Sequence, residues 1–181
     1  IIRAGFELFE TTPFNEITVN DILQKAYVSR GTFYKYFNNK YELMYLYYSN
    51  FLNTDILTEF DGTNWFELQT KCYRFGAEHR QFFRNVKDLE GQESFWWFMQ
   101  DVSTAIFRDI KRHNTGKEQV TTEEEFTIQC YVESAIFAFK QIVFSQTDLP
   151  VETVSEIVYK MLPDDYKIYK TCIAKLPSIS H

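Results

Sequence analysis

Three polar residues at helix-start positions constrain the first 47 residues of the chain more than any other sequence feature. Each can accept a hydrogen bond from the free N–H groups of a first helical turn: Thr18, Ser29 and Asn39. An acidic residue follows the first and the last of them three positions later, which is the spacing of a capping box. Only residues 27–28 lie between the helices that the first two caps would start. This short connection predicts a helix-turn-helix.

A further helix is expected before this pair, because apolar residues recur at helical spacing near the N-terminus. The residues of its apolar face include Ile2, Phe6 and Phe9, and the pattern ends near Thr12-Pro13. We expect the helix after the second cap to cover 30–37 and the next to run from 39 to about 58. Residues 1–47 are therefore interpreted as a three-helix head.

The helix expected over 30–37 has two unlike faces at 100° per residue. Phe33 and Phe37 share the face that would pack on the other head helices. The opposite face and its margins carry Gly31, Thr32, Lys35, Tyr34 and Tyr36. A tyrosine offers an apolar ring and a hydroxyl that can reach a phosphate or a base edge, and a glycine allows close approach to the major groove. The alternative is an ordinary solvated helix with tyrosines at its rim.

The charges of the head point to the same partner. The chain has a net charge of −6, yet residues 25–40 contain four cations and no acid. These cations are Lys25, Arg30, Lys35 and Lys40. Phosphate attraction acts mainly within a Debye length of about 10 Å, so a local basic surface on an acidic protein can still bind DNA. We expect Arg30 to reach a guanine and Lys40 to meet a phosphate at the start of its helix.

One string of residues follows a known family pattern: Thr18-Val19-x-x-Ile22-x-x-x-Ala26-x-Val28-Ser29-x-Gly31-Thr32-Phe33-Tyr34-x-Tyr36-Phe37-x-x-Lys40-x-x-Leu43. On these residues the head resembles the DNA-binding domain of the TetR family of bacterial transcriptional regulators. The resemblance implies DNA contacts from Thr18, Asn20, Arg30, Gly31, Thr32, Tyr34, Lys35, Tyr36 and Lys40. One departure is Tyr27, since the family usually has glycine in this turn. A left-handed conformation there would cost a residue other than glycine on the order of 1 kcal/mol.

The resemblance also implies what the remainder, residues 48–181, does. In the family a larger helical body dimerises and binds a small molecule, which releases the head from its operator. The composition agrees with an all-α body, because 18 Phe and 12 Tyr stand beside only 6 Gly and 4 Pro. Helices are expected at 65–79, 81–88, 93–113, 122–145, 151–162 and 166–174, with a break between head and body at 61–64.

Aromatic residues of the body suggest a binding cavity. The string from Phe95 to Met99 is apolar on every side of a helix, which indicates burial all round. We expect a largely apolar or aromatic ligand, since flat rings suit a cavity that stacks on a ligand. The candidate wall residues are Tyr73, Trp96, Trp97 and Phe137. Core packing alone would account for the same residues.

Two helices near the C-terminus are expected to form a symmetric four-helix dimer interface, as in the family. The first combines small and bulky residues, and the second carries a valine stripe. The candidate interface residues are Ser134, Ala135, Ala138, Ile142, Val154 and Val158. Packing within one chain is the alternative.

Other classes of function find little support in the sequence. The histidines form no HxxxH or HExxH pair, no Gly-rich phosphate loop occurs, and we expect neither enzymatic activity, metal nor cofactor. The three cysteines lie far apart, which suits a reducing cytoplasm, and no apolar run is long enough for a membrane span. Two functions remain: a ligand-responsive homodimeric regulator on an inverted-repeat operator, most often a repressor in such families, and a TetR-like adaptor acting through a protein partner.

Overall fold

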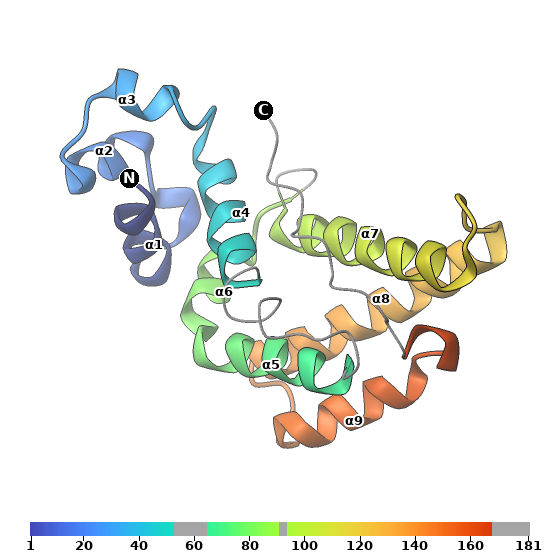
Figure 1. The fold of residues 1–181 in the computed structure, drawn as a ribbon. Helices are drawn as coiled ribbons and strands as arrows, with labels where there is room; N and C mark the ends of the chain where they lie inside the picture. The colour runs from blue at the N-terminus through green and yellow to red at the C-terminus, as the bar shows by residue number, and fades with distance from the viewer. Residues whose placement is uncertain (53–64, 91–93, 168–181) are drawn as a thin grey trace.

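The computed structural model describes residues 1–52, 65–90 and 94–167, and this part of the chain is helical (Figure 1). The predicted all-α class is confirmed. The α-helices are α1 (Ile2–Thr11), α2 (Val19–Ala26), α3 (Arg30–Tyr34), α4 (Lys40–Phe51), α5 (Trp65–Glu78), α6 (Arg80–Val86), α7 (Phe95–Thr115), α8 (Thr122–Val143) and α9 (Val151–Met161), with 3-10 turns at Phe14–Glu16 and Asp164–Tyr166.

The head consists of α1 to α3 and the start of α4, and the three predicted caps are present. The Thr18 hydroxyl accepts from the Asp21 N–H at 3.2 Å, and Ser29 and Asn39 cap α3 and α4 in the same way. Phe33 is fully buried against the other head helices, as its position on the wheel predicts. The head core also contains Phe9, Phe14, Ile22 and Leu43.

The regular helix α3 is shorter than predicted. It ends at Tyr34 rather than at Phe37, and Lys35 and Tyr36 form a turn. The Phe37 N–H still donates to the Phe33 carbonyl at 3.0 Å, which keeps the Phe37 side chain in the core. Burial of the two phenylalanines, rather than helix length, therefore sets the outward face.

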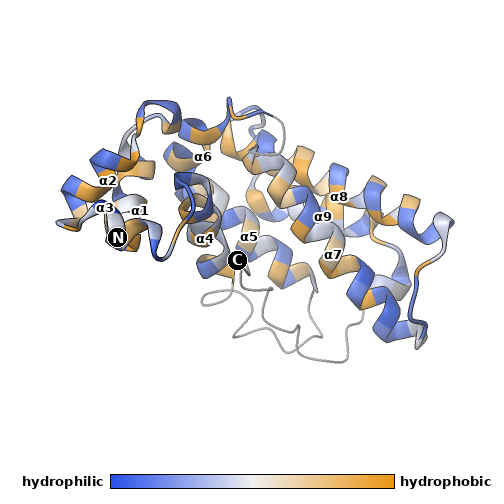
Figure 2. Cartoon of the chain, turned by 90° about the horizontal axis from the view of Figure 1, so that it is seen from above, coloured by the Kyte–Doolittle hydropathy of each residue, from blue (hydrophilic) through white to orange (hydrophobic). Residues whose placement is uncertain are grey.

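In the body, α7 and α8 are antiparallel, and α5 packs on both α8 and α9. Arg108 of α7 pairs with Glu125 of α8, and Gln100 pairs with Glu133 nearer the other end. Close contact between α5 and α8 depends on Gly76, because a Cβ there would lie 2.6 Å from the Phe139 ring. Figure 2 shows apolar residues alternating with polar ones along these helices, as expected when one face of each is buried.

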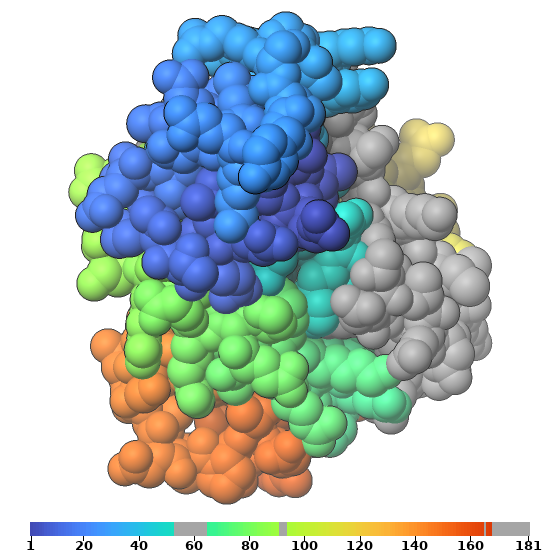
Figure 3. Space-filling model, turned by 90° about the vertical axis from the view of Figure 1, so that its left-hand side faces the viewer, coloured from blue at the N-terminus to red at the C-terminus, as the bar shows by residue number. Residues whose placement is uncertain are grey.

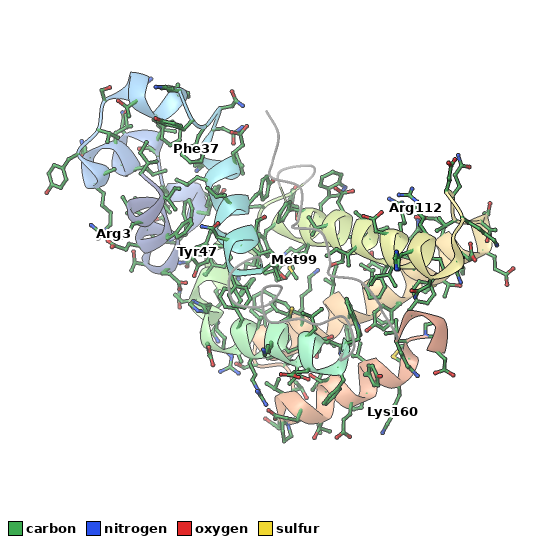
Figure 4. The ribbon with its side chains drawn as sticks, in the orientation of Figure 1. Arg3, Phe37, Tyr47, Met99, Arg112 and Lys160 are labelled. Carbon is green, nitrogen blue, oxygen red and sulfur yellow. The ribbon has the colours of Figure 1, made fainter. Side chains whose placement is uncertain are left out.

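The head joins the body through α4 and α6. Figure 3 shows the α5–α6 region between the head and the region of α8 and α9. The Asn85 side chain of α6 donates to the Phe9 carbonyl of α1 at 2.8 Å. Tyr47 of α4 also lies at this junction, whereas Arg112 is near the distant end of α7 (Figure 4). Helix α6 is thus in direct contact with α1.

Most predicted helix boundaries agree with the structure within about two residues. One correction concerns 114–115, which lie beyond the helix predicted at 93–113 but belong to α7. The loop begins at Gly116, whose φ of 67° makes it a left-handed C-cap. The predicted helical residues 53–58, the break at 61–64 and most of the helix at 166–174 lie outside the described residues. Among those described, no helix is both long and apolar enough to cross a membrane.

Candidate nucleic-acid interface

The outward surface of α3 is open, aromatic and basic. Tyr34 and Tyr36 are about half exposed, at 47% and 52%. Gly31 has open surroundings, since a Cβ there would meet only the Ser29 hydroxyl oxygen, at 3.9 Å. The Lys35 ammonium lies 5.5 Å from the centre of the Tyr36 ring. Packing within the described chain therefore does not require glycine at position 31.

Arg30 is held by the helix before it. Its Nη2 donates to Asn20 Oδ1 at 2.8 Å, joining the first turn of α3 to the first turn of α2. Both side chains are exposed. A guanidinium fixed at one edge keeps its other N–H groups in a planar fork, which is the geometry that reads a guanine. The structure thus brings together two residues that the sequence analysis assigned separately to DNA.

Thr18 and Thr32 use their hydroxyls within the chain. Thr18 donates to Asp21 Oδ2 at 2.6 Å, and the Thr18 hydroxyl and N–H together hold the pKa of Asp21 below its ordinary value. The Thr32 hydroxyl lies 2.9 Å from the Ser29 hydroxyl. Each threonine therefore supports a helix start, and a DNA contact by either would be in addition to this role.

Lys40 is placed differently from the other predicted contacts. Its ammonium donates to the carbonyls of Phe14 and Ile17, at 2.7 Å each, and lies 4.5 Å from the centre of the Phe14 ring. These bonds satisfy carbonyls around the 3-10 turn and join it to α4. The ammonium has a structural role in the head, and its contact with a phosphate stays a prediction.

Tyr27 was noted in the sequence only as a departure from the family pattern. Its backbone has φ 54° and ψ 43°, so the left-handed conformation is kept without glycine. Its side chain is 95% exposed, which makes it the most exposed large apolar side chain described. The sequence feature that could have drawn attention to Tyr27 is a large aromatic residue at a turn position that favours glycine.

A cavity of about 110 Å³ lies between α4, α5, α7 and α8. Tyr73 is on its wall as predicted, with other aromatic side chains that the sequence did not single out: Tyr48, Trp65, Phe107, Tyr131 and Phe139. The other three candidates lie elsewhere. Trp97 and Phe137 are 49% and 65% exposed, and Trp96 packs half-buried against Phe139 and Phe144. The structure therefore does not bring the four predicted wall residues together.

Polar groups on the cavity wall are bonded to one another. Tyr131 donates to Gln69 Oε1 at 2.7 Å, Gln69 donates to the Ser155 carbonyl at 3.2 Å, and Tyr73 donates to the Ala135 carbonyl at 3.0 Å. Burial raises the pKa of both tyrosines and raises the pKa of the Cys72 thiol to about 12. These groups remain neutral near pH 7, so the wall described is suited to an uncharged ligand.

A groove of about 710 Å³ lies between α8 and α9 on the surface. Four predicted interface residues line it: Ser134, Ala138, Val154 and Val158. The other two do not, because Ala135 is on the cavity wall and Ile142 is buried in the core. Four exposed apolar residues of the groove were not among the candidate interface residues, and Phe137 had been assigned to the cavity wall instead: Phe137, Leu149, Ile157 and Met161.

The fold and the surface of α3 together define a helix-turn-helix DNA-binding protein with a helical body. Residues 1–45 match the family of bacterial regulatory proteins, tetR family. The head therefore matches the DNA-binding domain of that family, which confirms the resemblance seen in the sequence.

Two relatives extend the comparison beyond the head. A protein of Lactococcus lactis subsp. lactis (strain IL1403), described as the HTH-type dhaKLM operon transcriptional activator DhaS, is 29% identical over 100 residues, which are 55% of this chain and 54% of the relative. The match thus spans about half the length of that protein. A solved structure described as dihydroxyacetone kinase operon activator DhaS has a TM-score of 0.61 and 20% identity, covering 94% of this chain and 96% of that one. The fold of head and body is therefore shared.

Proposed function

We propose that the protein is a homodimeric transcription regulator that reads an inverted-repeat operator with α3 and responds to a small, largely apolar molecule. The outward surface of α3 carries this proposal. There Arg30 is held by Asn20, Gly31 leaves room for a groove wall, and Tyr34, Lys35 and Tyr36 provide hydroxyls and charge. Two such helices at a fixed spacing would read two half-sites, as a dimer requires.

Selection of genomic DNA fragments by the purified protein tests the proposal and yields the operator. Arg30→Ala should then lower the preference for operator over random DNA, because a good base contact is worth roughly 1–3 kcal/mol. Arg112→Ala is the matched control, since it removes the same charge at the far end of α7 (Figure 4). Equal losses on operator and random DNA would contradict base reading by Arg30. Failure to select any fragment would favour the adaptor that acts through a protein partner.

The cavity supports the response to a ligand. Its volume is near that of an engineered apolar cavity, roughly 150 Å³, that binds benzene. Trp65 is on the wall, so its fluorescence is a direct probe of occupancy, whereas Trp96 and Trp97 are not on the wall. A screen of neutral aromatic compounds should yield one that changes this fluorescence and also the affinity for the operator. A Trp65→Phe variant separates the signal of the cavity from that of the other two tryptophans.

The direction of regulation has two candidates. Repression is the expectation from the sequence, but both relatives are described as activators of an operon. That description supports activation as the second candidate for this chain. A reporter placed behind the selected operator, compared with and without the protein, decides between them by the sign of the change.

A further inference from the structure

The junction between head and body contains three polar side chains that operator reading does not use. Glu10 belongs to α1, Tyr47 to α4, and His79 lies between α5 and α6. The Tyr47 hydroxyl donates to Glu10 Oε1 at 2.5 Å, and His79 Nδ1 lies 2.8 Å from the same oxygen and 3.1 Å from the Tyr47 oxygen. One carboxylate oxygen of Glu10, in the head, is therefore contacted both by Tyr47 of α4 and by His79 of the body.

The roles of donor and acceptor follow from the carboxylate. An ionised carboxylate only accepts hydrogen bonds, so the geometry assigns the proton of the imidazole to Nδ1 of His79 and makes the Tyr47 hydroxyl a donor. Burial, and then the bond to Glu10, raise the pKa of Tyr47, which keeps its proton in place. Hydrogen bonds to a charged acceptor are stronger than those between neutral groups.

Packing surrounds this cluster on both sides. The Tyr47 ring lies 4.4 Å from the Phe6 ring of α1 and 4.7 Å from the Phe82 ring of α6. The Asn85 side chain of α6 donates to the Phe9 carbonyl of α1, which adds a polar link between α1 and α6. The cluster thus lies where α1 is attached to the body.

Two helices that carry the cluster or lead to it, α4 and α5, also line the cavity. On α4, Tyr48 faces the cavity while its neighbour Tyr47 belongs to the cluster. On α5, Cys72 and Tyr73 face the cavity, and the helix leads directly to His79. His79 is six positions after Tyr73 in the sequence, which is about 9 Å along a helix. A displacement of α4 or α5 at the cavity therefore moves a member of the cluster.

We propose that Glu10, Tyr47 and His79 form a latch that transmits the state of the cavity to the head. The closed latch holds α1 in one position on α6, and a ligand that displaces α4 or α5 weakens it. A ligand can do this only by binding one of the two states more tightly. The inference rests on the proposed function, because it assigns the route by which an occupied cavity changes operator binding.

A cavity-filling substitution can represent the ligand while the ligand is unidentified. Ser103 lines the cavity from α7, outside the latch, and Ser103→Leu would add an apolar group to the empty space. We expect it to change operator affinity by at least about fivefold, as a modest allosteric coupling would. In a Tyr47→Phe background, which keeps the ring and removes the hydroxyl, the same substitution should change affinity by less than about twofold. If the cavity and the latch were not coupled, Ser103→Leu would change operator affinity by the same factor in both backgrounds, within roughly twofold.

Tyr159→Phe is the matched control, because it removes a hydroxyl from α9, away from the head. Glu10→Gln opens the latch from the head side and should abolish the response to Ser103→Leu as Tyr47→Phe does. An equal response with and without the Tyr47 hydroxyl would overturn the latch. The latch would also be overturned if Ser103→Leu alone left the operator affinity unchanged.

Hydrogen exchange of the α1 amides provides a readout without DNA. Tyr47→Phe should speed this exchange by about fivefold or more relative to Tyr159→Phe, since opening the latch frees α1 from α6. If the unaltered protein selected no DNA, the proposed function would fail, and exchange alone would decide the latch. Identical exchange in the two variants would then refute it.

Discussion

Lys35 and Lys40 show at the scale of single residues why a cation in a DNA-binding motif need not serve DNA first. Both belong to the same acid-free segment of the sequence. Lys35 lies over an exposed tyrosine ring, whereas Lys40 donates to two backbone carbonyls of the head. The sequence analysis could identify the segment but not separate these roles, because the acceptors of Lys40 lie 26 and 23 residues earlier in the chain.

Lys40→Met should lower the free energy of unfolding of the head by about 1–3 kcal/mol. The substitution keeps much of the aliphatic stem but removes the ammonium that donates to the Phe14 and Ile17 carbonyls, of which the Phe14 carbonyl keeps the Ile17 N–H. Loss of hydrogen bonds from a charged donor carries a cost of this size. Lys35→Met is the control and should stay within about 0.5 kcal/mol, as exposed substitutions do. It should instead reduce the slope of operator affinity against salt by about one unit. Urea unfolding and titrations at several salt concentrations measure both effects, and equal stability of the two variants would contradict this division of roles.

Tyr27→Gly should raise the free energy of unfolding by about 0.5–1 kcal/mol. The φ of 54° is unfavourable for any residue with a Cβ, and the exposed tyrosine side chain contributes little packing that glycine would lose. The greater freedom of glycine in the unfolded chain offsets part of the gain. Tyr27→Ala keeps the Cβ and should show no gain. If both variants unfolded at the same urea concentration, strain at this position would not be the cause.

At the scale of helices, the cap residues made the head predictable because they act within four residues of their own position. Thr18, Ser29 and Asn39 each start a helix as expected. The end of α3 depends instead on Phe33 and Phe37 packing against other helices, and that burial is not encoded by local spacing. The pairing of α7 with α8 is likewise set by distant partners such as Arg108 and Glu125.

Glu125→Gln should weaken the protein at pH 7 and have less effect in acid. The Arg108 guanidinium holds the pKa of Glu125 below its ordinary value, so the pair contributes stability above roughly pH 4.3, and this is lost as the pH falls through the lower folded value. The expected loss at pH 7 is about 0.5–1 kcal/mol, since both side chains are partly exposed. Glu123→Gln in the same helical turn is the control. A loss that is the same at pH 3 and pH 7 would show that charge is not its source.

At the scale of the whole molecule, the sequence predicted two sites in the body but could not divide its residues between them. Phe137 was expected on the cavity wall and lies in the surface groove, whereas Ala135 was expected at the interface and lies on the cavity wall. Both are on α8, two positions apart. Apolar residues on a long helix buried on several sides can face the cavity, the core or a partner, and only the placement of α5, α7 and α9 decides which.

The groove between α8 and α9 gives a sharper test of the proposed dimer than a buried position would. Ala138 is only 6% exposed within one chain, so a glutamate there would damage the fold of the protomer itself. Phe137 is 65% exposed in the groove, and Phe137→Glu should dissociate the dimer without unfolding it. A carboxylate buried at a symmetric interface costs several kcal/mol per copy.

Phe126→Glu is the matched control for the dimer, because Phe126 is 68% exposed on the same helix but does not line the groove. Sedimentation at low micromolar concentration should show a monomer for Phe137→Glu and a dimer for Phe126→Glu. At a concentration low enough for both variants to be monomeric, their free energies of unfolding should agree within about 0.5 kcal/mol. The monomer should also lose most of its affinity for the full operator, since one α3 reads a single half-site. A Phe137→Glu protein that stays dimeric would move the interface away from α8 and α9.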